Sequence, residues 1–314
     1  MPYNNLTSRA DVAATIPENV GAEIVKAADE ESAAMRFFRR IPMPASQTRF
    51  PVLSALPVVY WVSGDTGQKQ TTEVAWSNKY INVEELAAIL PIPDAVAEDI
   101  QFNIWDRAKP MLAEAIARQL DATIFFGDSA GGLNFPTNVA AAAVAAGNVY
   151  ARGTNNAAAG GLAEDINQIT STVEADGFDV NGYVTDRRYR GRLRSVRATD
   201  GQKLLDISTS QLDGADIQYA MRGLWPTGLS VAEMFAGDWD QFVLGIRRDI
   251  TFEVFHEGVI QDNTGAIIYN LMQQDMSAIR VVFRAGWQVS NPMNYTQATE
   301  ANRYPAAVLR SPAV

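Results

Sequence analysis

Side chains that commonly perform catalysis or bind metals are scarce in this sequence. Its 314 residues include no cysteine and one histidine, His256. The absence of cysteine excludes disulfides, thiolate nucleophiles and cysteine-ligated metals, and a single histidine excludes sites built from several imidazoles. A serine-histidine-aspartate site would have to use His256, which ends a predicted strand in FEVFHEG, and we favour a structural role for it. We therefore expect no catalytic residue, no metal and no cofactor.

Two glycine-containing stretches and two acidic runs are also interpreted as structural. GDSAGG at 127–132 lacks the dinucleotide spacing and GDTGQK at 64–69 lacks the phosphate-loop spacing, so both are predicted to be turns. The acidic runs at 29–31 and 238–240 could ligate a hard cation, but we interpret them as solvated ends of helices or loops.

An arginine cluster stands out from this background. Six arginines lie between positions 187 and 197 with no acid among them: Arg187, Arg188, Arg190, Arg192, Arg194 and Arg197. On a helix, the subset Arg187, Arg190, Arg194 and Arg197 shares one face. Such charges repel one another, so the cluster requires anions: carboxylates of a neighbouring subunit, nucleic acid, or solvent and salt. The net charge of −10, from 26 basic and 36 acidic residues, favours neighbouring carboxylates.

The composition indicates a folded globular chain. Hydrophobic residues make up 47% and charged residues 20%, which excludes a disordered or collagen-like chain. No segment approaches the roughly 20 apolar residues of a membrane-spanning helix, and the polar start MPYNNLTSRAD does not resemble a secretory signal. We expect the protein to stay where it is made, without membrane contact.

The first third of the chain is predicted to form elements that bury too few apolar side chains to fold alone. Residues 1–48 form a polar arm with one amphipathic helix, at about 19–38, and residues 49–82 form a long β-hairpin. The hairpin carries Tyr60, Trp61 and Trp76 on its arms. Two interpretations stay open: an edge hairpin folded onto its own domain, or an extension that buries these aromatic residues against a second subunit.

The remainder predicts an α+β chain with a discontinuous domain. A strand at 83–93 precedes a long helix at 104–126, in which Pro110 should cause a kink near Asp106 or a helix start near Lys109. A mixed α/β insert follows. Strands at 242–247, 251–256 and 278–289 then return to the first part. The polar, proline-containing tail at 295–314 is expected to be loosely held.

This order of elements resembles the Hong Kong 97-like major capsid proteins of tailed bacteriophages. The likeness lies in VEELAAILPIPDAVAEDIQFNIWDRAKPMLAEAIARQLDATIFFG (83–127), GYVTDRRYRGRLRSVRATDGQKLL (182–205) and QQDMSAIRVVFRAGWQVSNP (273–292). The resemblance implies an N-terminal arm (1–48), an E-loop (49–82), a P-domain in two parts (83–137 with the spine helix, and 241–294), an inserted A-domain (138–240) and a C-terminal tail (295–314).

The resemblance also implies a function. Members of this family build hexamers and pentamers of an icosahedral shell around double-stranded DNA, so we expect a structural protein of the virion that is not an enzyme and is assembled in the bacterial host cytoplasm. Interface candidates are Tyr60, Trp61, Lys69, Trp76, Arg187, Arg190, Arg194 and Arg197. An encapsulin-like nanocompartment shell is the alternative, and a soluble carboxylate-dependent enzyme is a remote one.

The same resemblance sets expectations about partners. The spine-like helix begins near residue 104, which leaves room only for the arm and the E-loop before it, so we expect a separate scaffolding protein or none, and favour the former. A portal and optional decoration proteins are expected as well. The enclosed DNA would not be bound sequence-specifically. Lys69, near the hairpin tip, is the candidate for the lysine of the cross-links that some members form. No position matches the asparagine or the assisting glutamate, so cross-linking is not expected.

Overall fold

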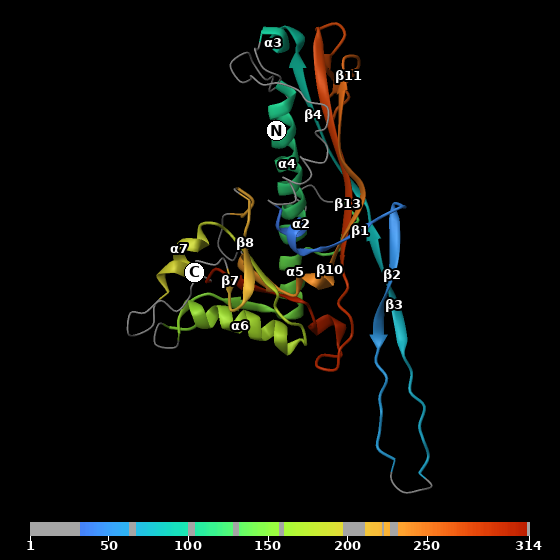
Figure 1. Ribbon diagram of the computed structural model, residues 1–314, viewed down its shortest axis with the longest axis vertical. Coiled ribbons are helices and arrows are strands. Elements are labelled where there is room, and N and C mark those ends of the chain that lie inside the picture. The colour runs from blue at the N-terminus through green and yellow to red at the C-terminus, as the bar shows by residue number, and fades with distance from the viewer. Residues whose placement is uncertain are drawn as a thin grey trace.

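The computed structural model describes residues 32–62, 67–99, 104–127, 132–156, 160–196, 211–221, 223–226 and 232–312. Figure 1 shows a tall unit in which a long helix runs beside a four-stranded sheet, a second unit to one side, and a hairpin that extends beyond both. None of the helices in these ranges combines the length and apolar character that a membrane crossing requires.

The four-stranded sheet brings together strands that are far apart in the sequence. Its order is β1 (Arg39–Pro42), β10 (Phe242–Phe255), β13 (Met276–Val289) and β4 (Glu84–Pro93). β1 runs parallel to β10, and the other neighbours are antiparallel. The strands predicted at 242–247 and 251–256 are one strand, β10, whose pairing with β13 shifts in register between Ile246 and Thr251.

The long helix α4 (Ile104–Phe126) covers one face of this sheet. The predicted inward face of β13 is confirmed, since Val281, Phe283, Ala285 and Trp287 are all buried in the main core. The helix begins at Ile104, so the alternative start near Lys109 is wrong. Pro110 removes one backbone hydrogen bond, but Ile104 and Trp105 are buried with Ile92 and Ile279, and this packing holds the turn before it.

The six-stranded sheet forms the second unit. Its order is β5 (Val149–Ala151), β14 (Ala306–Arg310), β9 (Ala232–Gly237), β6 (Gly182–Thr185), β8 (Ala215–Tyr219) and β7 (Gln211–Leu212). Alternation along β9 serves two cores, because Phe235 joins the main core while Met234 and Ala236 join a second one. The second core includes residues of α6 (Leu162–Ala175) and α7 (Tyr189–Ser195), and the main core includes residues of α4 and α5 (Val139–Ala146).

The expectation of a loosely held tail at 295–314 is wrong. β14 lies inside the six-stranded sheet, parallel to β5 and antiparallel to β9. The run Ala306 to Leu309 is buried on both faces. Composition misled here because the polar residues before this strand form the connection from β13, whereas the five strand residues are apolar except the last.

The described part of the arm is folded against the body. The short helix α2 (Ala33–Phe37) buries Ala33, Ala34 and Met35 in the main core, and Phe38 joins them. Most of the helix predicted at 19–38 lies outside the described residues. The remaining small elements are α3 (Asp94–Asp99), the β11 (Val259–Gln261) and β12 (Ile267–Asn270) hairpin, and two 3₁₀ turns, η2 (Trp239–Gln241) and η3 (Glu300–Asn302).

Candidate assembly surfaces

The predicted hairpin is formed by β2 (Gln47–Ala55) and β3 (Ala75–Asn82), which pair antiparallel from Gln47 opposite Asn82 outward. Beyond this ladder the two arms remain linked. The backbone N–H of Val58 donates to Thr72 Oγ1 at 2.8 Å, and the Tyr60 hydroxyl donates to the carbonyl of Thr71 at 3.0 Å. In its described part, the outer segment of the hairpin is therefore extended and is held together by few hydrogen bonds.

The base of the hairpin sits on a pair of glycines. Gly245 and Gly286 are cross-strand neighbours in β10 and β13. A Cβ on Gly286 would lie 2.0 Å from the carbonyl oxygen of Asn82, and one on Gly245 would lie 2.2 Å from Met43 Sδ. Ile81 is fully buried between these strands and Met43. The two glycines thus let the hairpin base lie directly on the sheet.

The segment after β13 braces the next part of the hairpin. The backbone N–H of Met293 donates to the carbonyl of Leu53 at 3.0 Å, and the Tyr295 hydroxyl donates to the carbonyl of Pro57 at 2.7 Å. An ion pair between Lys79 and Glu300 adds a further link. These contacts with the body end at Pro57, so what lies beyond it projects from the molecule, as Figure 1 shows.

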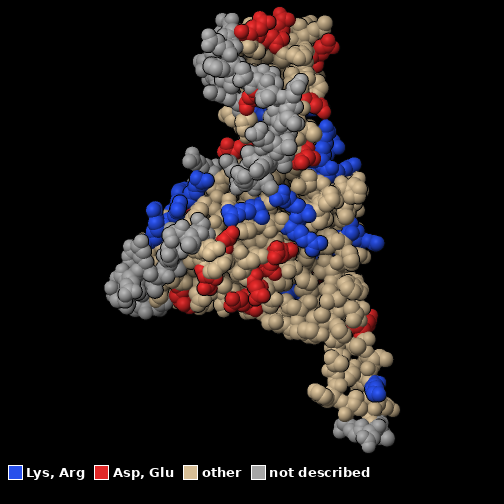
Figure 2. Space-filling model, viewed as in Figure 1, with Lys and Arg blue, Asp and Glu red and all other residues tan. Residues whose placement is uncertain are grey.

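The projecting part exposes large apolar side chains. Trp61 is fully exposed and Val59 is 91% exposed, while Tyr60, whose hydroxyl is bonded within the hairpin, is less so. Trp76, which lies opposite Leu53 in the paired ladder nearer the body, is 65% exposed. Lys69 is exposed as well, and Figure 2 shows that the hairpin is almost free of charged side chains. A bare apolar surface of this kind is typical of a protein contact site.

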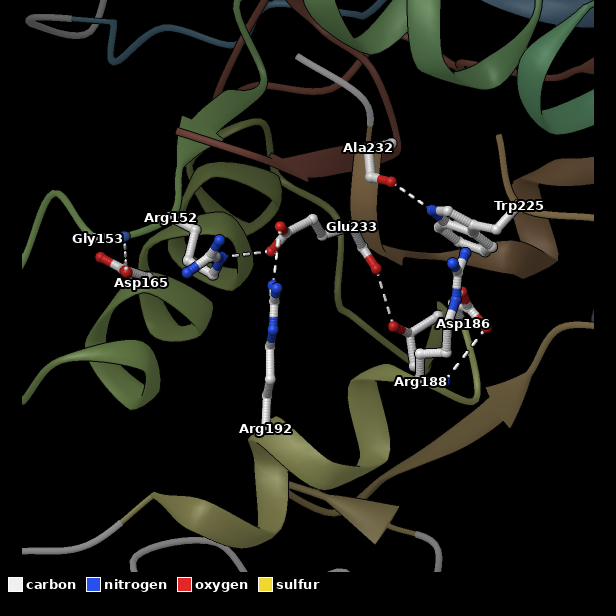
Figure 3. Close-up of polar contacts among 10 residues, drawn as sticks. Arg152, Gly153, Asp165, Asp186, Arg188, Arg192, Trp225, Ala232 and Glu233 are labelled. Carbon is white, nitrogen blue, oxygen red and sulfur yellow. Dashed lines mark hydrogen bonds and ion pairs between the residues drawn. The ribbon is translucent and has the colours of Figure 1, made fainter. Parts of the chain in front are cut away.

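The described members of the arginine cluster lie on α7, a helix of seven residues, or directly before it. The anions considered for the cluster did not include carboxylates of the same chain, yet two of its members pair with such carboxylates. Arg188 pairs with Asp186, and Arg192 pairs with Glu233 at 2.9 Å. Arg152 also binds Glu233, at 2.6 Å, so this one carboxylate joins two arginines (Figure 3).

Glu233 was not identified from the sequence because it lies 41 residues from Arg192. Strand pairing brings it close: Glu233 belongs to β9, and its carbonyl accepts a hydrogen bond from Thr185 Oγ1 of β6 at 2.8 Å. Burial, assisted by the negative charge of Glu233, raises the pKa of the nearby Tyr189 hydroxyl. No local pattern in the sequence marks a contact made by neighbouring strands.

The arginines chosen from the sequence as interface candidates have different surroundings. Arg187 and Arg190 are exposed, and the guanidinium of Arg190 lies 5.5 Å from the ring centroid of Tyr219. Burial raises the pKa of the Tyr219 hydroxyl, and the charges of Arg190 and Arg194 oppose that rise. Arg194 is also exposed, and Arg197 lies outside the described residues.

A buried carboxylate fixes the point where the arm joins the body. Asp121 of α4 accepts hydrogen bonds from Ser32 Oγ at 2.7 Å and from the backbone N–H groups of Ala33 and Ala34 at 2.9 and 3.1 Å. Burial raises the pKa of Asp121 to about 6, although all three hydrogen bonds lower it. This cap holds the start of α2 against the long helix.

His256 belongs to a structural link. Its Nδ1 lies 2.9 Å from Ser277 Oγ, and the Ser277 hydroxyl donates to Asp94. In a catalytic triad the histidine stands between the serine and the acid, whereas here the serine stands between the other two. The contacts tie α3 to β10 and β13.

The sequence GDSAG at 127–131 matches the spacing G-x-S-x-G of the hydrolase nucleophile elbow. That elbow turns from a strand into a helix, whereas Gly127 directly follows helix α4. Residues 128–131 lie outside the described ranges. Among the described residues, no group of three or more His, Cys, Asp or Glu could hold a metal ion.

Comparisons with known proteins agree with this architecture. The model of the Phage capsid family matches residues 12–294. The major capsid protein of Staphylococcus phage 80alpha is 23% identical over 294 residues, covering 92% of this chain and 86% of that protein. The family match covers the hairpin, the long helix and the strands of both sheets up to the end of β13.

Solved structures show the same fold. A chain of Microbacterium phage Oxtober96 has a TM-score of 0.79 at 33% identity, covering 97% of this chain and 99% of that one. A chain of Mycobacterium phage Adephagia has a TM-score of 0.78 at 25% identity, covering 98% and 99%. The chain therefore belongs to the phage capsid family, has the α+β Hong Kong 97-like fold, and is a structural coat protein of the virion capsid that assembles into an oligomeric shell.

Proposed function

We propose that copies of this chain form hexamers and pentamers that close into an icosahedral shell around double-stranded DNA, and that the hairpin joins each copy to a neighbour. The observation that carries this proposal is the projecting hairpin, whose fully exposed Trp61 and largely exposed Val59 lie beyond the last contact with the body. Burying a large aromatic side chain contributes roughly 1.5–3 kcal/mol. A neighbouring copy supplies the surface that would bury it.

Tyr60, Trp61 and Trp76 are the apolar anchors in this proposal, and Lys69 contributes a charge near the tip. Aromatic residues dominate the energy of protein interfaces when they are fully desolvated, so these side chains would carry most of the contact. The contact would be heterologous, because the hairpin of one copy meets the body of another, and such contacts close into rings.

The proposal includes the packaged DNA and the absence of catalysis. A net charge of −10 disfavours adhesion to phosphate, so the shell would enclose DNA without binding a sequence. The contacts of His256 with Ser277 support a structural role for the histidine. Assembly in the host cytoplasm and the scaffolding, portal and decoration partners are supported by family membership alone.

Removing the projecting part of the hairpin tests this role. Residues 58–72 are replaced by an Asn-Gly turn, which leaves the Tyr295 to Pro57 contact in place. We expect a soluble chain with unchanged far-ultraviolet circular dichroism that forms no shells in electron micrographs under conditions in which the complete chain forms them. Shells at normal yield from the shortened chain would refute the proposed role of the hairpin.

A further inference from the structure

The six-stranded sheet carries opposite charges at the two ends of strand β6. The strand begins at Gly182, shortly after Asp179, and runs to Thr185, after which Arg187 and Arg190 follow. Since Gly182 pairs with Gly237 at the end of β9, Asp238 and Asp240 lie at the same end as Asp179. One end of the unit therefore carries these three aspartates, and the other carries Arg187 and Arg190.

The acidic end has an unbalanced charge. Asp238 is half-buried and accepts hydrogen bonds from Asn181 Nδ2 at 3.3 Å and Gln241 Nε2 at 3.1 Å. Burial raises the pKa of Asp238, and the charges of Asp240 and Asp179 add to the rise. In the part of the chain that the structure describes, none of these three aspartates forms an ion pair with a basic side chain.

The basic end has two arginines that the fold does not neutralise. Arg188 and Arg192 have carboxylates of the same chain as partners, whereas Arg187 and Arg190 pair with no carboxylate in the described ranges. Tyr219 lies under the guanidinium of Arg190 and steadies it at the surface. A positioned arginine loses less side-chain entropy when it binds a carboxylate, which suits it to an interface.

We propose that Arg187 and Arg190 of one copy bind Asp179, Asp238 and Asp240 of the next copy around a capsomer ring. This inference rests on the proposed function, because a closed ring repeats one contact between two different surfaces of each subunit. On the face that Figure 2 shows, basic side chains gather on the α7 side of the lateral unit, and acidic ones gather toward its α6 side, where a second group of basic side chains adjoins them. Charges of opposite sign at the two ends of β6 suit a head-to-tail contact.

Charge reversal tests the contact. One variant reverses the basic end by Arg187→Glu and Arg190→Glu. A second variant reverses the acidic end by Asp179→Lys and Asp240→Lys. Asp238 is retained because its hydrogen bonds stabilise the fold. We expect each reversal alone to lower the yield of rings at least tenfold, measured by sedimentation and electron microscopy. The chain with both reversals should regain rings, because every contact is again between opposite charges. Arg187→Lys with Arg190→Lys keeps the charge and should assemble.

Mixing the two singly reversed chains provides a second test that does not depend on the doubly reversed chain folding. Only contacts between unlike chains are attractive in the mixture, so the chains must alternate around a ring. Six positions can alternate and five cannot, so we expect the mixture to form hexamers and few pentamers. Two outcomes would overturn this pairing, provided that the unaltered chain forms shells. One is normal ring formation by either singly reversed chain, and the other is the absence of rings in both the doubly reversed chain and the mixture. Because the unaltered chain still assembles, either outcome would leave the coat function intact.

Discussion

The carbonyl oxygen of Asn82 occupies the place that a side chain on Gly286 would take. A Cβ added there would lie 2.0 Å from that oxygen, far inside van der Waals contact. Gly286 has no positive φ angle, so its role is to let another backbone approach, and not to form an unusual turn. The angle at which the hairpin leaves the body therefore depends on a missing side chain.

Gly286→Ala should displace the hairpin base. Backbone atoms must shift to admit the methyl group, and we expect a loss of about 1–3 kcal/mol in the free energy of unfolding, together with poor shell formation. Gly191→Ala is the matched control, because a Cβ there meets no atom within 4 Å and alanine favours the helix α7. Urea denaturation measures both variants. Equal unfolding free energies for Gly286→Ala and Gly191→Ala would contradict the close packing of the hairpin base against Gly286.

Trp61→Ala should separate assembly from folding. The side chain is fully exposed, so the unfolding free energy of the monomer should change by less than about 0.5 kcal/mol. The concentration needed for assembly should rise at least tenfold, because an aromatic anchor is lost. Trp239→Ala, at a fully buried tryptophan, should instead cost about 3–5 kcal/mol in folding. An unchanged assembly threshold for Trp61→Ala would remove Trp61 from the interface.

Asp121 should make the folded chain more stable as the pH falls from about 6 to about 4. Burial raises its pKa from 3.8 to about 6, so in this range the folded chain binds a proton that the unfolded chain does not. The contribution is fully present below pH 4, is lost as the pH rises through 6, and amounts to about 3 kcal/mol. Asp121→Asn abolishes this titration. Urea unfolding at several pH values should show the difference between the two chains growing toward low pH, and parallel profiles would disprove it.

Glu233→Gln should destabilise the six-stranded unit more than Asp186→Asn does. The side chain of Glu233 is 14% exposed and pairs with two arginines. The side chain of Asp186 is 20% exposed but pairs with one arginine, Arg188, whose side chain is 68% exposed. Losing a mostly buried charge partner should cost about 2 kcal/mol, and losing the surface pair less than about 1 kcal/mol. Thermal unfolding ranks the two variants. A larger loss for Asp186→Asn would show that the Glu233 pairs are weak.

Periodic patterns made the long elements predictable, whereas contacts between distant segments were not. The apolar faces of 104–126 and 278–289 are repeated over enough residues to identify α4 and β13. The pairing of Glu233 with Arg152 and Arg192 and the capping of α2 by Asp121 depend on which segments meet in space. Contacts of this kind do not recur at regular spacing in the sequence. Interface candidates could therefore be chosen by their aromatic or basic character, but their partners could not be identified.

Truncation near the C-terminus should show that β14 is an integral strand. A chain ending at Pro305 lacks the strand between β5 and β9, which leaves the backbone groups that paired with β14 without partners and removes the buried run Ala306 to Leu309. Burying these side chains contributes several kcal/mol at about 25 cal/mol per Å², so we expect an insoluble or protease-sensitive six-stranded unit. A chain ending at Arg310 retains the strand and serves as the control. Because β14 lies between β5 and β9, the six-stranded sheet cannot close without it, and a fully protease-resistant chain ending at Pro305 would refute this dependence.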